Sequence, residues 1–375
     1  MDLSLTEDQL FMRDEANRFL AERASSETVR AAIASGGHDP TLWGSISREL
    51  GWCGIAIPED DGGLGLGAFE MTLLLEETGR RLTPVPLWTT VSLSAPIIRA
   101  LAADDARPGL LRRIASGDLA ATVALPRPSA SDPFEAIDFT ARLDGSRWRL
   151  SGRCAAVFNL ASADLVLIPA RLTNGLGLFA IERGLISGIG ALDTLDPTMP
   201  VASLSLHGIT VEDDARIDRS EFEASAFAAP MLWARLGLAA EQVGAASGCL
   251  ELTLAYIGER VQFGRSIASF QAVKHRCAEL LVRIGEARSL LYGAAQSLSA
   301  GEEQAEAEIE GAGVLASEAL WRAAEEAIQL HGGVGNTWEY DPHLYLRRAQ
   351  VTANLFGSTE TKLARIALNL PEAAA

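Results

Sequence analysis

The spacing of apolar residues predicts a helical region at the start of the chain. From Thr6 onward, apolar side chains recur every three or four residues, which is the spacing of an amphipathic helix. Thr6 and Gln9 stand where a capping box would close the first turn of that helix. A stretch rich in turn residues, 58–65, interrupts the pattern, and a further helix is expected through 76–77. We therefore expect residues 1–117 to form an all-helical domain.

The pattern then changes to an alternation of apolar and polar residues, which is typical of strands. Asp144 and Gly145 form a two-residue turn signal between the alternating runs 140–143 and 146–150, and this predicts a β-hairpin. Further strands are expected at 163–170, 176–181 and 202–211. We expect residues 118–225 to form a small β-domain.

Helical spacing returns after residue 225, and the predicted helices are long. They are expected at 231–262, 270–299 and 302–331. Gly332 and Gly333 follow the last of them and provide a natural C-terminal stop. Long amphipathic helices joined by short links favour a four-helix bundle over residues 226–375. The chain is thus expected to have an α+β fold with three domains.

Composition and charge narrow the classes of ligand and partner. The chain has 375 residues, of which 48% are hydrophobic, and a formal net charge of -17. Such an acidic protein is not expected to bind nucleic acid or an anionic membrane, because both require a basic surface. The cysteines are far apart and the histidines lack metal-binding spacing, so we expect free thiols and no metal site.

No membrane span or leader is evident in the sequence. The longest apolar runs fall short of the ~18 residues that a membrane-spanning helix needs. The amino terminus also lacks the basic region of a secretory leader. We therefore expect a cytoplasmic protein.

A basic segment carries the first candidate for chemistry. It places four cations near one link between two predicted helices: Arg260, Arg265, Lys274 and Arg276. These are either ordinary solvated charges or a site for phosphate or diphosphate, for which guanidinium groups are geometrically suited. Neither a dinucleotide-binding G-x-G-x-x-G nor a P-loop signature is present in the chain.

A glycine-rich segment carries the second candidate. Gly332, Gly333 and Gly335 come directly after a predicted helix. A helix C-cap explains one or two of them. Three glycines within four positions indicate a backbone packed against a flat or bulky group.

Together these segments resemble the acyl-CoA dehydrogenase family. The family pattern R-x-x-F-G-x-x-I-x-x-F-Q matches residues 260–271, and the pattern Q-x-x-G-G-x-G matches residues 329–335. Shorter matches follow the family's order at 50–52, 57–59, 62–65, 76–79 and 341–348. The resemblance covers nearly the whole chain, and the ordered set of motifs is more specific than any one of them.

The resemblance implies a fold, an assembly and a cofactor. The fold would be a helical domain, a β-domain and a four-helix bundle, assembled as a tetramer of two dimers. FAD would lie between subunits, with Arg260 and Phe263 of the adjacent subunit at its diphosphate and adenine end. The residues implied in cofactor binding are Arg260, Phe263, Phe270, Gln271, Gln329, Gly332 and Gly333.

The resemblance also implies a reaction. In the family, a carboxylate removes the α-proton of an acyl-CoA while the β-hydride goes to flavin N5. Arg235 matches a family arginine near the pantetheine and acyl pocket and is the implied substrate-binding residue. A cation there suits an acidic protein that must bind polyanionic CoA. Electron-transfer flavoprotein is an expected electron acceptor.

The sequence departs from the family at the catalytic base. Many members carry a glutamate before a Gly-Thr pair, where this chain has Phe356, and others carry it before the long-helix arginine, where this chain has Ala234. Glu241 and Glu360 lie nearby in the sequence. Each is more typical of an ordinary helix or loop carboxylate than of a relocated base. No catalytic residue is therefore assigned.

The predicted β-domain departs from the family as well. Residues 124–132 stand where members often carry a T-E-P-x-A-G-S-D-like flavin loop, and Ala156 stands where an aromatic residue usually packs against the flavin. Arg127 or Ser129 are the candidates to replace these contacts.

These departures lead to three hypotheses. We favour a base-lacking subunit of an α2β2 acyl-CoA dehydrogenase, like those of bacterial steroid and sterol side-chain catabolism, whose homologous mate supplies the glutamate. The alternative is a self-sufficient homotetrameric acyl-CoA dehydrogenase with a relocated base. A structural subunit without flavin is the third, and the intact flavin motifs weigh against it.

Overall fold

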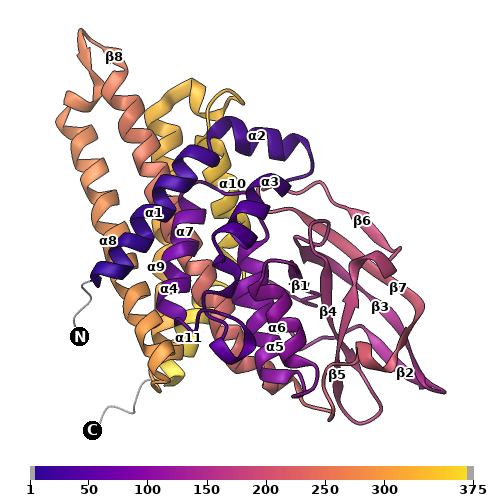
Figure 1. Ribbon diagram of the computed structural model, residues 1–375. Coiled ribbons are helices and arrows are strands. Elements are labelled where there is room, and N and C mark those ends of the chain that lie inside the picture. Colours follow the sequence, from indigo (N-terminus) through magenta and orange to yellow (C-terminus); the bar gives the residue numbers. More distant parts are fainter. Residues whose placement is uncertain (1–4, 370–375) are drawn as a thin grey trace. The chain divides into compact units, whose positions relative to one another are not determined.

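The computed structural model describes residues 5–369, which form two compact units (Figure 1). The helical unit comprises the residues up to 31, 72–83 and those from 235 onward, and the sheet unit comprises 32–71 and 84–234. The three-domain boundaries at residues 117 and 225 stay a prediction of the sequence.

The helical unit is built mainly from long helices. Its elements are α1 (Glu7–Arg23), α7 (Ala228–Glu259), α8 (Gln271–Ala300), α9 (Ala305–His331), α10 (Pro342–Thr352) and α11 (Thr359–Asn369), with most of α2 (Ser26–Ala34) and α4 (Ala68–Arg80). Helix α9 packs against α8, α10 and α11. The predicted helical C-terminal region is confirmed. So is the capping box, because Thr6 and Gln9 bond each other's backbone at the start of α1.

The predicted helix 231–262 was wrong at its C-terminal end. Helix α7 ends at Glu259, and a short hairpin of β8 (Val261–Gln262) and β9 (Arg265–Ser266) follows it. Phe263 and Gly264 form the turn with φ of +54° and +77°, which is the backbone of a two-residue hairpin turn. Val261 and Gln262, the last residues of the predicted helix, are exposed and belong to this hairpin instead.

Helices α4 and α7 touch through their backbones. A Cβ atom at Gly244 would lie 1.8 Å from the Glu76 carbonyl oxygen, and one at Gly248 would lie 2.0 Å from the Arg80 carbonyl oxygen. From the α4 side, a Cβ at Gly79 would lie 2.1 Å from the Glu241 carbonyl oxygen. Only glycine fits such an approach. All residues from 236 to 250 are buried, as expected of a helix surrounded by others.

The sheet unit contains a seven-stranded, mostly antiparallel sheet. Its strands are β1 (Ala121–Val123), β2 (Thr140–Asp144), β3 (Arg147–Phe158), β4 (Leu165–Arg171), β5 (Leu176–Glu182), β6 (Ile189–Ala191) and β7 (Val201–Glu212). They pair in the order β1-β4-β2-β3-β7-β6, and β5 pairs with β4. The predicted hairpin is present, but its two-residue turn is formed by Gly145 and Ser146, because Asp144 pairs with Arg147 as the last residue of β2. Gly145 has φ +65° in this turn. The predicted β-rich middle of an α+β fold is confirmed.

Short helices complete the sheet unit. They are α3 (Pro40–Gly44), α5 (Ala95–Leu101) and α6 (Arg107–Ala115), the π-helices η1 (Ser45–Glu49) and η4 (Thr89–Ser94), and the 3-10 turns η2 (Trp52–Gly54), η3 (Glu59–Asp61), η5 (Arg183–Leu185), η6 (Asp213–Ala215) and η7 (Ala224–Phe227). In the helical unit the 3-10 turns are η8 (Ile267–Ser269) and η9 (Gly332–Asn336). Among the described residues, no helix has the length and apolarity to cross a membrane.

We predict that Gly244→Ala destabilises the protein by about 3 kcal/mol, because the new methyl group must push apart two backbones. Gly258→Ala is the matched control on the same helix. It has open space around its Cβ position and should be neutral or stabilise by up to about 1 kcal/mol. Denaturant unfolding of both variants measures the difference, and equal free energies of unfolding would contradict the backbone contact.

Candidate cofactor and substrate site

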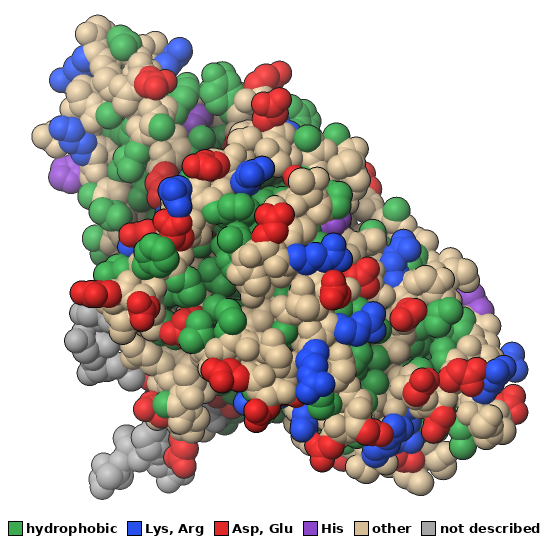
Figure 2. Space-filling model, in the orientation of Figure 1, with side chains coloured by type: hydrophobic (Ala, Val, Ile, Leu, Met, Phe, Trp, Pro, Cys, Tyr) green, Lys and Arg blue, Asp and Glu red, His purple; other side chains and the backbone are tan. Residues whose placement is uncertain are grey.

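The hairpin between α7 and α8 is the most exposed part of the candidate site. Residues 260–270, the arm, project at the end of these two helices (Figure 1). Phe263 at its tip is 93% exposed. The Arg265 guanidinium lies 4.0 Å from the ring centroid of Phe270, and the rings of Phe263 and Phe270 meet edge-to-face at 6.2 Å. Lys and Arg side chains gather on this end of the molecule (Figure 2).

The arm brings together four of the residues that the sequence predicts for cofactor binding. Arg260 opens it and is exposed, Phe263 turns it, and Phe270 closes it. Gln271 follows as the first residue of α8 and is exposed as well. Basic and aromatic groups therefore stand next to each other on one surface, although the chain as a whole is acidic.

The remaining predicted residues lie at the end of α9. Gln329 is exposed in its last turn, and Gly332 ends the helix with φ +64°. Gly333 has an ordinary φ, and a Cβ there would meet nothing within 4 Å. The chain itself therefore gives no steric reason for glycine at 333. A group from outside the chain that packs against this backbone would give one.

The two groups of residues are joined through α7. The ring of Tyr256, in the last turn of α7, stacks on His331 with centroids 4.1 Å apart. The Tyr256 hydroxyl also donates to the His331 carbonyl oxygen at 3.3 Å. The arm and residues 332–341, which we name the glycine segment, are thus anchored on one helix.

These residues fit an FAD-type ligand. Guanidinium groups such as that of Arg260 bind diphosphate oxygens, and an exposed aromatic ring such as Phe263 packs against a planar ring system. The open backbone at Gly333 accepts a bulky neighbour without a clash. Most of these residues are exposed in the chain that bears them, and Phe270 is half-buried.

The predicted substrate residue, Arg235, lies in a buried ion cluster. Its Nη1 lies 3.0 Å from Oε1 of Glu310, a residue that is only 2% exposed. The other carboxylate oxygen of Glu310 accepts from Arg365 Nη2 at 3.1 Å. Burial raises the pKa of Glu310, against the opposing influence of Arg235, Arg365 and Lys362. Burial also lowers the pKa of Lys362.

Sequence reasoning missed Glu310, although a signal was present. Position 310 lies on the same face of α9 as the buried residues Ser317 and Ala324. An acidic residue on an apolar helix face is buried only when it is paired. The burial pattern therefore predicts a cationic partner for Glu310, but sequence spacing does not identify which residue it is.

Phe356 and Ala234, the two positions at which the resemblance led us to look for a catalytic base, are both buried. Phe356 is 1% exposed, has φ +62°, and its carbonyl oxygen accepts from Arg365 Nη2 at 2.7 Å. Ala234 is buried, and its carbonyl accepts from Trp88 Nε1 at 3.1 Å. Arg365 thus binds both the backbone of Phe356 and the carboxylate of Glu310.

The two nearby carboxylates both have local partners. Glu241 is buried and forms an ion pair with Arg348 at 3.4 Å. Glu360 lies in the first turn of α11, where its Oε2 accepts from the Ser358 hydroxyl at 2.8 Å. These contacts are those of a structural ion pair and of a helix start.

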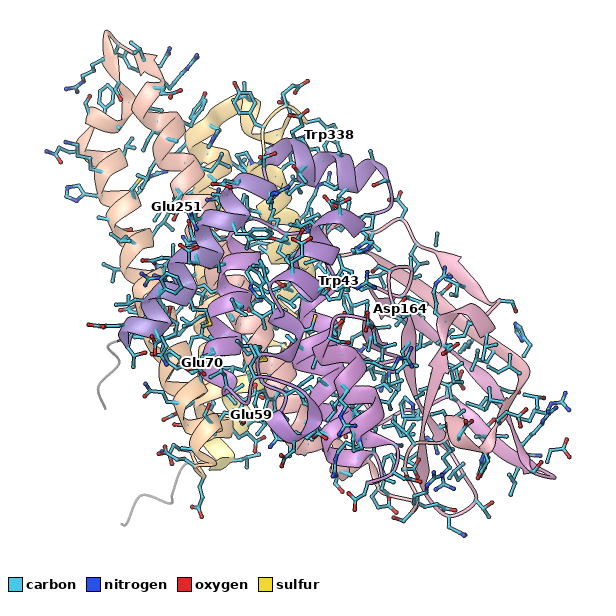
Figure 3. The ribbon with its side chains drawn as sticks, viewed as in Figure 1. Trp43, Glu59, Glu70, Asp164, Glu251 and Trp338 are labelled. Carbon is cyan, nitrogen blue, oxygen red and sulfur yellow. The ribbon has the colours of Figure 1, made fainter. Side chains whose placement is uncertain are left out.

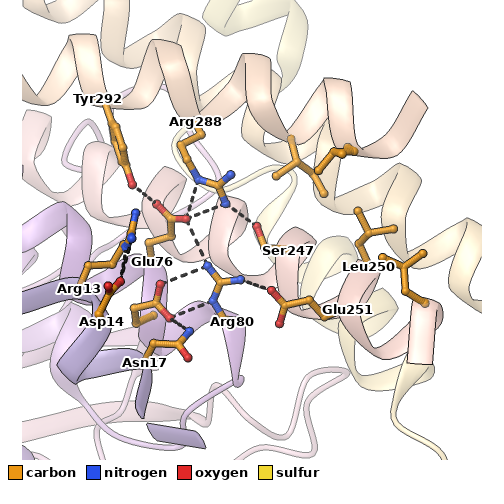
Figure 4. A pocket seen from close by; sticks show the side chains of 14 residues that line it. Arg13, Asp14, Asn17, Glu76, Arg80, Ser247, Leu250, Glu251, Arg288 and Tyr292 are labelled. Carbon is orange, nitrogen blue, oxygen red and sulfur yellow. Dashed lines mark hydrogen bonds and ion pairs between the residues drawn. The ribbon is translucent and has the colours of Figure 1, made fainter. Parts of the chain in front are cut away.

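A polar pocket of about 430 Å³ in the helical unit explains the motif at 76–79 (Figure 4). Arg288 Nε donates to Glu76 at 2.8 Å, and the Tyr292 hydroxyl donates to the same carboxylate at 3.0 Å. Arg80 binds Glu77 at 2.9 Å. These charges pair with one another across α4 and α8, which indicates a structural role for the pocket.

The candidate residues of the predicted β-domain lie on a loop and at a sheet irregularity. Arg127 is exposed and 4.0 Å from Glu135, and Ala156 lies at a register shift between β3 and β7. Ser129 lies in the turn of the same loop. Their proposed flavin contacts stay a prediction.

Comparison with known proteins places the chain in a family. Residues 6–118 match the model of the acyl-CoA dehydrogenase N-terminal domain, and residues 225–370 match that of its C-terminal domain. The chain is 33% identical to acyl-CoA dehydrogenase IpdE2 of Mycobacterium tuberculosis over 96% of both chains.

Two solved structures are similar over nearly the whole chain. One is the ChsE4-ChsE5 complex from Mycobacterium tuberculosis, with 28% identity, a TM-score of 0.86 and complete coverage of both chains. The other is a variant of the Tcur3481-Tcur3483 steroid acyl-CoA dehydrogenase, with 31% identity, a TM-score of 0.82 and 97% coverage of both chains. The chain belongs to the acyl-CoA dehydrogenase family. It is thus a member of a family of FAD-dependent oxidoreductases, as the sequence motifs predicted.

We predict that Glu310→Gln lowers the free energy of unfolding by about 3 kcal/mol, because it leaves Arg235 and Arg365 buried without their anion. Glu318→Gln is the matched control, since it makes the same change at an exposed position of α9. That control should shift stability by less than about 0.5 kcal/mol. Equal unfolding curves for the two variants would contradict the buried ion cluster.

Proposed function

We propose that the chain is the base-lacking subunit of an α2β2 acyl-CoA dehydrogenase that desaturates the α,β-bond of an acyl-CoA. The mate is a homologous acyl-CoA dehydrogenase subunit, which supplies the catalytic carboxylate. When bound, FAD supplies the hydride acceptor of this reaction. The proposal also includes a cytoplasmic location and electron-transfer flavoprotein as electron acceptor.

One contrast within the chain carries the proposal. The arm is exposed, with Phe263 93% accessible, whereas Phe356 and Ala234 at the two base positions are buried and cannot accept a proton from carbon. The chain thus retains the surface that serves a neighbour's cofactor and lacks the group that serves its own chemistry. A subunit that lends contacts to its mate has this combination.

Each predicted residue then has a role toward the mate's cofactor. Arg260 binds the diphosphate through charge-assisted hydrogen bonds, and Phe263 packs at the adenine end. Within the arm the Phe270 ring packs against the Arg265 guanidinium, and Gln271 is the first residue of α8. Gln329, Gly332 and Gly333 contact the cofactor across the dimer. Arg235, with its partner Glu310, is the cation of the acyl pocket.

The similar structures support a two-subunit assembly and a substrate class. ChsE4-ChsE5 and Tcur3481-Tcur3483 are each described as pairs of different chains, and the second is described as a steroid acyl-CoA dehydrogenase. This supports a homologous mate and an acyl group from steroid or sterol side-chain catabolism.

One observation favours a second candidate, the self-sufficient homotetramer. Glu310 is a buried carboxylate that shares Arg365 with the carbonyl oxygen of Phe356 and forms an ion pair with Arg235, the residue after Ala234. Its pKa is raised by burial, which favours a base, but cations bind both of its oxygens. Those contacts weigh toward a structural anion.

Co-expression with a homologous acyl-CoA dehydrogenase subunit encoded alongside this chain tests the proposal. We expect a complex with equal numbers of the two subunits that desaturates acyl-CoA, and no activity from this chain alone. Full activity of the chain as a homotetramer would contradict the proposal. In that case loss of activity in Glu310→Gln, with the protein still folded, would identify the relocated base.

We predict that Arg260→Ala weakens FAD retention in the complex by about ten-fold or more, because it removes a charge-assisted contact with phosphate. Flavin remaining per complex after gel filtration measures the effect. Arg322→Ala, which removes an exposed arginine from α9, is the control and should retain flavin like the wild type. Equal retention in both variants would remove Arg260 from the flavin site.

A further inference from the structure

The glycine segment, residues 332–341, is fixed to the helical unit on one side by aromatic rings. His331 stacks on Tyr256, and Tyr340 meets both rings edge-to-face, at 6.0 Å from Tyr256 and 6.2 Å from His331. The His331 ring is oriented by a contact of its Nδ1 with the Ala327 carbonyl at 2.7 Å. The start and the end of the segment are thereby tied to α7.

On the other side the segment is fixed by one arginine from the start of the chain. Arg30 of α2 donates from Nε to Oδ1 of Asp341 at 3.0 Å, and its Nη1 donates to the carbonyl oxygen of Trp338. Arg30 and Asp341 are about three-quarters shielded from solvent. Trp338 lies in the loop that precedes α10 (Figure 3). The planar guanidinium thus holds a side chain and a backbone group of the segment at once.

The two ends of the glycine segment differ in their surroundings. Gly332 and Gly333 have open space at their Cβ positions, whereas Trp338, Tyr340 and Asp341 are bound. A backbone surface that neighbouring residues already hold in its binding conformation loses less entropy when a ligand binds, so it binds more tightly. The supports described here act on the segment and leave the two glycines accessible.

We propose that Arg30 is a positioning residue for cofactor binding: through Asp341 and the Trp338 carbonyl it holds the glycine segment in the conformation that contacts the flavin nucleotide of the mate. This inference rests on the proposed function, and it adds a residue of α2 that lies outside every family motif in the sequence. Arg30 touches no cofactor itself and acts through the segment.

A histidine makes this support sensitive to pH. His343 is buried, its ring lies 4.7 Å from that of Trp338, and neither of its nitrogens has a partner among the described residues. Burial lowers the pKa of His343, and the cations Arg347 and Arg30 lower it further, whereas Asp341 raises it. Because the pKa of this histidine is lower in the folded state, its contribution to the free energy of unfolding is fully present above its usual pKa of about 6.5. That contribution is lost as the pH falls through the lowered pKa, since the buried ring must then take up a proton.

The test compares Arg30 variants in the full-length chain and in its complex with the mate. Arg30→Gln removes the charge, Arg30→Lys keeps the charge without the planar fork, and Arg23→Gln is the control at an exposed arginine of α1. Hydrogen exchange of residues 332–341 in the chain alone reports the position of the segment. Flavin retained per complex between pH 5.5 and 8 reports the consequence.

We expect faster exchange confined to the segment and about ten-fold weaker flavin retention in Arg30→Gln, with an intermediate effect in Arg30→Lys. His343→Gln should reduce the loss of flavin in acid, and the exposed His275→Gln should not. Part of the loss should remain in His343→Gln, because burial also lowers the pKa of His331 at the start of the segment. Exchange and retention equal to Arg23→Gln would overturn the proposal. If Arg30→Gln does not fold, Arg30→Lys and Asp341→Asn give the same comparison.

The two proposals fail in different ways. A wild-type complex without flavin, or one whose flavin retention does not respond to Arg260→Ala, contradicts the proposed function whatever Arg30 does. A wild-type complex that loses flavin in Arg260→Ala but not in Arg30→Gln contradicts only the positioning role. Faster exchange throughout the helical unit in Arg30→Gln would also contradict it, since it would mean a general loss of stability.

Discussion

The helical unit depends on one constraint, the direct contact between the backbones of α4 and α7. Gly79, Gly244 and Gly248 let the two helices approach until carbonyl oxygens lie where side chains would be. Interiors are close-packed, so an added methyl group has nowhere to go. Around this crossing, Glu76 and Glu77 are paired with Arg80 and Arg288, so charges that would be costly to bury alone are compensated.

The residues predicted for cofactor binding lie where the long helices begin or end. Helix α7 leads into the arm, its last turn carries Tyr256 against His331, and α9 ends at Gly332. Because α7 is fixed at its centre by the crossing, its end is a firm support for both the arm and the glycine segment. Rigid elements thus carry exposed groups at the surface, which is the arrangement that precise binding of a cofactor requires.

Sequence patterns predicted what depends on neighbours in the chain. The capping box at Thr6, the hairpin between 140 and 150, and the helix stop at Gly332 are confirmed because local geometry determines each of them. The turn of that hairpin lies one residue later than predicted, at Gly145 and Ser146. The motifs also identified the family. The end of α7 was predicted wrongly, because the apolar Val261 stands at helical spacing from Ile257 although it lies on an exposed hairpin.

What the sequence could not predict are the long-range pairings. Glu310 meets Arg235 and Arg365, and Arg30 meets Asp341, across separations that no spacing rule reaches. Tertiary packing determines which of these residues meet, and local sequence patterns do not reveal contacts between residues far apart in the chain. The cofactor roles of Arg260 and Gly333 stay predictions for the same reason, since they concern a second subunit.

The central claim is that this chain serves a cofactor that it does not hold by itself. The most direct measurement is the ratio of flavin to protein, read from the visible absorption spectrum of the chain purified alone and with its mate. The account predicts little or no flavin in the chain alone and bound flavin in the complex. A ratio near one in the chain alone would contradict it.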